Sequence, residues 1–372
     1  MHVFVVTNDF PPRMGGINYL VDQIMRRFPV GEVTIFSSTH PGAAEFDATY
    51  PHEVIRLQTT MMLPTPGVRR RVHAELRARK PDVVLFGAIW PLGHMGPGIS
   101  RKLGIPYAGF SQGLELTAAR IPGLLGPIGR QALFVSAGSA WTRQKVERAF
   151  DRVGDMPIVA SGIDVHIFGP NVSDRDVRRR HALGDAPVIC CVSRLVPRKG
   201  QDMLIRALPT VARAIRNVRL LIVGIGPHEK ALRRLAHANG VGDRVVFAGA
   251  ARYAELPAYF RAGDVFAMPC RARWFGLDVE ALGAVFLQAS AVARPIVVGR
   301  SGGAPEAVRD GETGVLVDPS SPQEIAAALI ALLEDPVRAA AMGAAGARWM
   351  LDEWTWDAQS ARVRDLLLAK LR

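Results

Sequence analysis

Short apolar segments alternate with amphipathic ones along almost the whole chain. In the first half, runs of strand length end at turn residues, and the segments between them carry apolar residues at helical spacing. The expected strands are residues 2–7, 33–38, 54–57, 82–88, 105–109 and 134–136, and the expected helices include 16–28 and 69–80. Strands that alternate with helices predict a parallel sheet with helices on both faces.

The same alternation resumes after a polar stretch near residues 154–187. Its expected strands are 187–195, 219–227, 244–249, 264–270, 295–300 and 314–319, with helices at 201–215 and after the cap residue Ser321. We therefore predict an α/β chain with two Rossmann-like domains, residues 1–162 and 163–350, each built on a doubly wound parallel sheet. Ligands of such folds bind at the carboxyl ends of the strands, which here would face a cleft between the domains.

Residues 351–372 are predicted to form a C-terminal helix that packs back toward the first domain. The amphipathic pattern begins at Asp352. Trp354 and Trp356, near the start of this helix, are expected to pack in the core.

The composition bears on the size of the core and on the redox compartment of the protein. With 372 residues, of which 49% are hydrophobic, each half can bury a core. The chain has three cysteines, and Cys190 and Cys191 are adjacent on an expected strand, so they point to opposite faces and do not pair. We expect buried free thiols in a reducing cytoplasm. No Cys/His spacing indicates a metal site, and the N-terminus lacks the apolar stretch of a signal peptide.

A net charge of +12 includes basic clusters at residues 26–27, 69–71 and 77–80. Such clusters form either a solvated face or a surface for an anionic partner. Because no helix-turn-helix, zinc-finger or RNA-binding motif is present, phospholipid headgroups are favoured over nucleic acid. The apolar segments 61–67 and 121–129 are therefore predicted to contact an anionic membrane together with the basic clusters.

The segment SRLVPRKG, residues 193–200, follows an expected strand directly. Its cations Arg194 and Lys199 are placed to bind both phosphates of a nucleoside diphosphate, although cations at a plain surface would give the same pattern. The glycine pair at residues 15–16 follows the first strand and fits either an anion at a helix start or a tight turn. GIGP, residues 224–227, lacks the acid that nicotinamide dinucleotide binding requires.

The segment EALGAVFLQ, residues 280–288, combines a carboxylate, small residues and an amide near a helix start. Its small residues leave backbone amides open to a phosphate, and either Glu280 or Gln288 can bind a hydroxyl group. Together with the cationic loop, this segment indicates an enzyme of nucleotide-activated sugars.

Six sequence motifs lie along nearly the whole chain. In their order along the chain, they are TNDFPPRMGGI, SRLVPRKGQDMLI, AGDVFAMPC, DVEALG, SGGAPEAV and AAMGAAG. In these motifs the chain resembles glycosyltransferase family 4, whose members are retaining enzymes of the GT-B fold. Within that family it is most similar to the actinobacterial GDP-mannose-dependent phosphatidylinositol mannoside mannosyltransferases. The resemblance implies a hexosyltransferase that acts on a glycolipid at the inner face of the plasma membrane, with GDP-mannose as donor and no metal cofactor.

The resemblance also implies roles for single residues. Gly16 would lie beside the donor diphosphate. Arg194 and Lys199 would bind the diphosphate and stabilise it as it leaves. Glu280 would hold a hydroxyl of the transferred hexose, and Gln288 would meet the ribose.

The backbone amides around Leu282 and Gly283 would face the donor phosphates in the same comparison. Two departures from the family pattern stand out. Gln288 replaces the second acid of the E-x7-E motif. In SQGLEL, residues 111–116, Gln112 and Leu114 replace both histidines of the T-H-G-H-E that is usual in the subfamily.

These departures leave alternatives open. Gln112 is counted as a catalytic position because the histidine it replaces lies near the reacting centre, yet an amide cannot carry a proton. The chain could therefore use another donor or acceptor, or be a weakly active or non-catalytic relative that binds sugar nucleotides. A nucleotide-sugar epimerase is disfavoured, because it needs acid–base side chains at the sugar.

Overall fold

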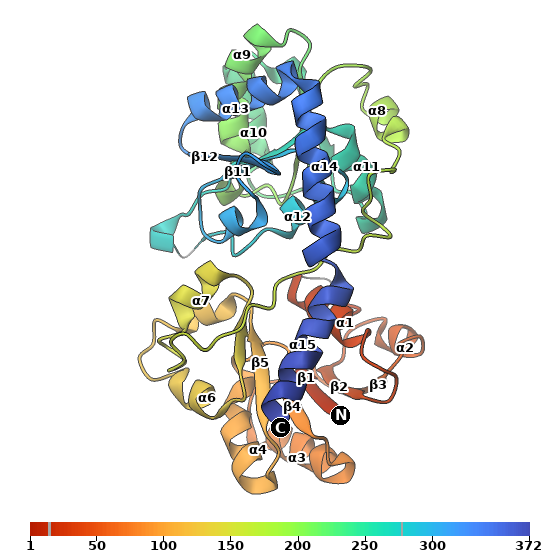
Figure 1. Ribbon diagram of the computed structural model, residues 1–372, viewed down its shortest axis with the longest axis vertical. Coiled ribbons are helices and arrows are strands. Elements are labelled where there is room, and N and C mark those ends of the chain that lie inside the picture. The colour runs from red at the N-terminus through yellow and green to blue at the C-terminus, as the bar shows by residue number, and fades with distance from the viewer. Residues whose placement is uncertain (14–15, 277) are drawn as a thin grey trace. The chain divides into compact units, whose positions relative to one another are not determined.

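The computed structural model describes residues 1–13, 16–276 and 278–372. It divides into two compact units. The first comprises Met1–Gly162 and Trp356–Arg372, and the second comprises Ile163–Thr355. Each unit contains a six-stranded sheet (Figure 1).

The sheet of the first unit is parallel throughout, in the order β3-β2-β1-β4-β5-β6. The order reverses between β1 and β4, which is the switch point where ligands of this fold bind. The strands are β1 Val3–Thr7, β2 Val33–Ser38, β3 Glu53–Leu57, β4 Val83–Phe86, β5 Tyr107–Ser111 and β6 Val135–Ala137. The helices are α1 Gly16–Met25, α2 Ala43–Asp47, α3 Pro66–Arg79, α4 Gly96–Leu103, α5 Leu114–Ala118, α6 Gly126–Gln131, α7 Ala140–Val146 and α15 Trp356–Leu371.

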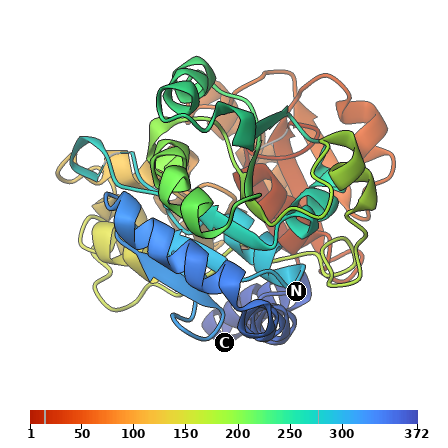
Figure 2. The ribbon, with the colours of Figure 1, turned by 90° about the horizontal axis from the view of Figure 1, so that it is seen from above.

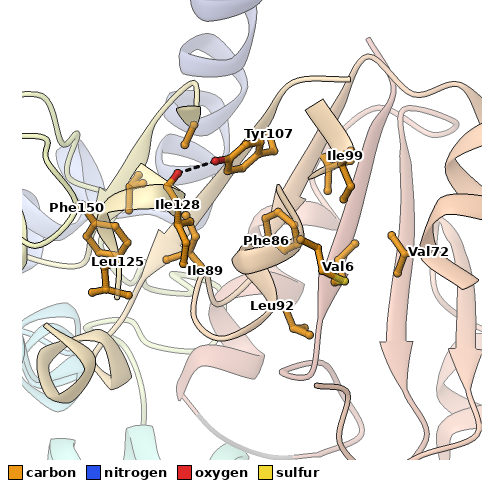
Figure 3. Packing of buried hydrophobic residues seen from close by; sticks show 14 of the residues in the cluster. Val6, Val72, Phe86, Ile89, Leu92, Ile99, Tyr107, Leu125, Ile128 and Phe150 are labelled. Atoms are coloured by element: carbon orange, nitrogen blue, oxygen red, sulfur yellow. Dashed lines mark hydrogen bonds between the residues drawn. The ribbon is translucent and has the colours of Figure 1, made fainter. Parts of the chain in front are cut away.

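Both faces of this first sheet are buried. Along β1, Phe4 and Val6 belong to one apolar cluster, and Val3 and Val5 belong to the other. The alternation follows from the two-residue period of a strand. In the first cluster, the hydroxyl of Tyr107 donates a hydrogen bond to the carbonyl of Ile128 at 2.7 Å (Figure 3).

The second sheet repeats this topology, in the order β12-β11-β10-β7-β8-β9. Its strands are β7 Val188–Val192, β8 Arg219–Val223, β9 Val245–Gly249, β10 Val265–Met268, β11 Ile296–Gly299 and β12 Gly314–Val317. The helices are α8 Arg175–Arg180, α9 Gln201–Ala214, α10 Glu229–Ala238, α11 Leu256–Ala262, α12 Ala284–Ala291, α13 Pro322–Glu334 and α14 Pro336–Glu353. Figure 2 shows these helices around the strands of the second unit. The predicted fold class, two doubly wound parallel sheets, is confirmed.

One-turn 3-10 helices complete the connections. They are η1 Leu92–Met95, η2 Pro197–Lys199, η3 Gly242–Arg244, η4 Tyr253–Glu255, η5 Trp274–Gly276 and η6 Ala304–Ala307. The three cysteines are free and buried, as predicted.

The predicted C-terminal helix is present, but it begins later than the predicted Asp352. α14 runs to Glu353, and α15 starts only at Trp356. At the break, the carbonyl of Trp354 accepts a hydrogen bond from the Ile163 amide at 2.7 Å, and Ile163 forms a parallel bridge with Thr355. Trp356 is buried in the core of the first unit, as expected, whereas Trp354 is only half-buried; α15 packs against α1 in the first unit.

Candidate functional site

The loop that leaves β7 carries both predicted diphosphate ligands. It passes through η2 and turns into α9 at Gly200, which has a left-handed φ of 78°. A Cβ at Gly200 would collide with the carbonyl oxygen of Pro269, the residue that follows β10. Only glycine fits both the backbone angle and the contact, so the loop lies close against the end of β10. β7 and β10 are the two strands at the switch point of this sheet.

Glu280 lies between two cations of this loop. Its carboxylate forms ion pairs with Lys199 Nζ and, at 2.7 Å, with Arg198 Nη1. The guanidinium of Arg198 also pairs with Asp278, with Nε to Oδ1 at 3.0 Å. The side chains of Lys199 and Glu280 are only 10% and 12% exposed, so both charges are shielded from water.

This cluster keeps Glu280 ionised. Burial alone would raise the pKa of Glu280, but the charges of Lys199 and Arg198 outweigh it and hold the pKa below its ordinary value. The structure thus brings the predicted residues Lys199 and Glu280 together. Sequence reasoning missed Arg198 and Asp278, although both stand inside the quoted motifs SRLVPRKG and DVEALG.

Arg194 has a different environment. Its side chain is exposed, and no carboxylate of the described residues forms an ion pair with it. Its backbone, however, is fixed, because the buried Gln201 donates a hydrogen bond from Nε2 to the Arg194 carbonyl at 3.0 Å. Arg194 is therefore a cation on a fixed backbone, open to an anionic ligand.

The start of α12 follows Glu280 closely. Leu282 is buried, and Gly283 caps the helix with a left-handed φ of 93°. The first amides of a helix have no partner within the helix, which makes this end suitable for a phosphate. Gln288, half-buried, lies in the second turn of α12.

The turn at residues 301–303 (SGG) packs against the backbone carbonyl of Glu280. Gly303 donates its amide to the Glu280 carbonyl at 2.9 Å. Gly302 has a φ of 60°, and a Cβ there would collide with the same carbonyl oxygen. Residues 301–303 therefore fix the backbone from which the carboxylate of Glu280 projects.

In the first unit, Gln112 follows the end of β5, and its Nε2 donates to the carbonyl of Val159 at 3.3 Å. The fully buried Glu115 accepts the amides of Trp90, Gln112 and Gly113 at 3.3, 3.1 and 3.2 Å. Burial raises the pKa of Glu115, and these backbone hydrogen bonds oppose the rise. Sequence reasoning missed Glu115, which joins the loops that follow β4 and β5. Leu114, in the place of the second histidine, is exposed.

Gly16, the remaining predicted donor ligand, is the first residue of α1. Met14 and Gly15 lie outside the described residues, so a contact of the glycine pair with the diphosphate stays a prediction. The preceding loop is held by Asn8, whose side chain exchanges two hydrogen bonds with the backbone of Met62, at 2.9 and 2.6 Å.

Comparisons with known proteins identify the family. Residues 173–349 match the family model of the group 1 glycosyl transferases. The chain is also 44% identical, over 374 residues and 98% of each chain, to the GDP-mannose-dependent alpha-(1-6)-phosphatidylinositol monomannoside mannosyltransferase of Mycolicibacterium smegmatis. The protein is a group 1 glycosyltransferase. The corresponding mannosyltransferase of Corynebacterium glutamicum, whose acceptor is monoacylated, is 40% identical over 99% of this glycosyltransferase and 98% of the relative.

Solved structures agree on the fold. HepE from Anabaena, in complex with UDP, superimposes with a TM-score of 0.83 over 99% of this chain and all of its own, at 21% identity. Sucrose-phosphate synthase from Thermosynechococcus elongatus gives 0.77 over 99% of each chain, at 20% identity. The predicted GT-B architecture is therefore confirmed, and the sequence relatives of 40–44% identity confirm the predicted class of enzyme, a hexosyltransferase. The roles of the individual site residues stay predictions.

Proposed function

We propose that this glycosyltransferase transfers mannose from GDP-mannose to a phosphatidylinositol mannoside, with retention of configuration. Relatives that match it over nearly their whole length carry out GDP-mannose-dependent transfer to phosphatidylinositol monomannoside, by their names. The observation that carries the proposal is the cluster at the carboxyl ends of β7 and β10. There, Lys199 is paired with Glu280, whose side chain is only 12% exposed, and Arg194 has no ion pair with a described residue.

In the proposed donor complex, the diphosphate binds Arg194 and attracts Lys199. When Lys199 turns to the phosphates, the carboxylate of Glu280 becomes free to accept a hydrogen bond from a hexose hydroxyl. Arg198, which pairs with Glu280 at 2.7 Å in the free enzyme, stays as its counter-ion and keeps it ionised. Gln288 faces the ribose and gives it a neutral hydrogen bond, which is weaker than the charge-assisted bond of a carboxylate.

The chemical step needs charge stabilisation more than acid–base side chains. The bond between mannose C1 and the β-phosphate oxygen breaks, and a hydroxyl oxygen of the acceptor bonds to C1 on the same face. The acceptor proton passes to the leaving phosphate oxygen. Arg194, Lys199 and the first amides of α12 stabilise the charge that develops on that phosphate, so the reaction is proposed to run without a metal. One such contact contributes about 3–4 kcal/mol in other enzymes.

We further propose that the first unit sits on the inner face of the plasma membrane as a peripheral protein. Met61 and Leu63, 60% and 48% exposed, precede α3, whose exposed residues include Arg69, Arg70 and Arg77. Each cation near an anionic bilayer contributes about 1 kcal/mol. Among the described residues, no helix is long and apolar enough to cross a membrane.

Vesicle flotation tests the membrane proposal. We expect binding to vesicles of anionic phospholipid and little binding to neutral vesicles, with a loss of binding when Arg69, Arg70 and Arg77 are all replaced by Gln. Equal binding to neutral and anionic vesicles contradicts an electrostatic contact.

Transfer itself is tested with radiolabelled GDP-mannose and phosphatidylinositol monomannoside. We expect a dimannosylated lipid, and at least a hundredfold loss of activity in Lys199→Ala. Lys230→Ala, an exposed lysine on α10, is the matched control and should retain activity. If the wild-type protein binds no GDP at millimolar concentration, the proposal fails.

A second candidate is a family member with another donor or acceptor, or one that binds sugar nucleotides with little turnover. Gln112, Leu114 and Gln288 favour it, because each replaces a side chain that is usual in the subfamily. A panel of nucleotide sugars, read by calorimetry and by release of the nucleoside diphosphate, separates the two. Binding of GDP-mannose without release supports the second candidate.

A further inference from the structure

A cavity of about 440 Å³ lies at the opposite edge of the second sheet from Arg194 and Glu280. It is formed where the chain enters β7, β10 and β11, and α13 and α14 close one side. Its lining includes Arg178, Asp264, Arg294, Leu332, Leu333 and Ala339. The proposed glycosyl transfer makes no use of this edge.

Arg294 places a positive charge in the wall of the cavity, and its hydrogen-bond partner is a neutral backbone carbonyl. Its Nε and Nη2 both donate to the backbone carbonyl of Arg261, at 3.2 and 2.6 Å. No carboxylate of the described residues lies within 4.0 Å of its guanidinium. Burial and the like charge of Arg261 lower the pKa of Arg294 to about 10. Arg294 is partly buried, and a partly desolvated cation without a counter-ion in contact is unusual, because desolvation costs more than hydrogen bonds to neutral groups return.

The nearest acids are already engaged elsewhere. Asp264 accepts the Val188 amide at 2.8 Å and pairs with Arg178 at 3.3 Å. Asp174 pairs with the same arginine at 3.0 Å. Asp185, which also lines the cavity, is exposed, so water screens its charge. Arg294 therefore has no carboxylate of the described residues in contact with its guanidinium, although Asp264 and Asp174 attract it at longer range.

The rest of the wall is apolar. Leu332 and Leu333 come from the end of α13, and Pro336 and Ala339 come from the start of α14. The volume is several times that of a single water molecule's share of liquid, roughly 30 Å³. A ligand that fits this wall has an apolar body as well as a charged group.

We propose that this cavity binds a small organic anion, with its anionic group on Arg294 and its apolar body against α13 and α14. Binding does not depend on the proposed transfer reaction, because the cavity and the diphosphate ligands are at opposite edges of the sheet.

Calorimetry with phenyl phosphate tests the proposal on the full-length chain. The background variant carries Arg194→Ala and Lys199→Ala, which removes the diphosphate ligands. We expect one phenyl phosphate to bind in this background, at least fivefold more tightly than inorganic phosphate. Arg294→Gln should weaken binding at least tenfold, whereas Arg338→Gln, an exposed arginine on α14, should not change it.

A second variant guards against misfolding of Arg294→Gln. Ala340 is exposed and lines the cavity, so Ala340→Trp fills the space from outside without disturbing the core. We expect it to abolish binding at an unchanged melting temperature. The proposal is overturned if either Arg294→Gln or Ala340→Trp binds phenyl phosphate like the background variant. It is also overturned if the background itself binds nothing while the wild type does, since the anion would then occupy the diphosphate site.

Discussion

Arg198 is the residue whose replacement best tests how the donor site works. It donates to Glu280 at 2.7 Å and pairs with Asp278 at 3.0 Å, and its side chain is 20% exposed. In the proposed donor complex Lys199 leaves Glu280 for the diphosphate. Arg198 then remains as the counter-ion of Glu280, although it touches neither substrate. It acts as a positioning residue.

The expected loss of kcat/KM in Arg198→Ala follows from the two contacts of Arg198, with Glu280 and with Asp278. A hydrogen bond to a charged group contributes about 1.5–3 kcal/mol, and removal of one partner leaves the other buried charge unpaired. Because Lys199 compensates Glu280 in the free enzyme, most of the loss falls on the donor complex. We expect Arg198→Ala to lower kcat/KM for the donor by about 2–3 kcal/mol, or roughly 30–150-fold.

The assay is release of GDP as a function of donor concentration and pH. Without Arg198, burial is less opposed and the pKa of Glu280 rises, so the acidic limb of the kcat/KM profile moves to higher pH. Arg198→Lys should restore part of the activity and of the pH profile. Arg206→Ala, an exposed arginine on α9, is the matched control. A loss of activity with an unshifted acidic limb would refute the counter-ion role and leave only a structural one.

Three further predictions concern the same site. Gly302→Ala should lower kcat/KM at least tenfold, because left-handed strain of about 1–2 kcal/mol adds to a collision with the Glu280 carbonyl; Gly311→Ala has similar strain but open space and should keep activity. Gln288→Glu should tighten GDP binding in calorimetry by about 1–2 kcal/mol, or roughly 5–30-fold, and weaker binding would contradict its ribose contact. Since the folded state lowers the pKa of Glu280, its stabilising contribution is present above the ordinary value of 4.5 and is lost as pH falls below it. Urea unfolding of Glu280→Gln should therefore depend less steeply on pH in that acidic range than the wild type.

Apolar periodicity predicted the strands well because both sheets are buried on both faces. The proximity of Lys199 to Glu280 also follows from the strand order of a doubly wound sheet, because β7 and β10 are neighbours at its switch point. The break between α14 and α15 does not follow. It lies where Ile163 pairs with Trp354 and Thr355, and no local sequence pattern indicates a pairing between residues so far apart.

The sequence also did not indicate which of the neighbouring cations contact Glu280. Arg198 and Lys199 are adjacent in η2, and the sequence alone does not say that both reach Glu280. Glu115 was missed for a related reason. The buried carboxylate of Glu115 accepts hydrogen bonds from three backbone amides and needs no charged side chain as partner. No pattern of paired charges in the sequence therefore indicates it.

The charges around the donor site also change the interpretation of Gln288. Arg198 and Lys199 pair with the carboxylates of Asp278 and Glu280, and Arg194 adds an exposed cation without an ion pair among the described residues, which leaves an excess of positive charge before the donor binds. A second acid at position 288 would cancel that excess, whereas glutamine preserves it for the diphosphate. In the proposed donor complex, the glutamine thus weakens a short-range bond to the ribose but strengthens a long-range attraction. Because salt screens only the long-range part, the advantage of Gln288→Glu in GDP binding should grow as ionic strength rises.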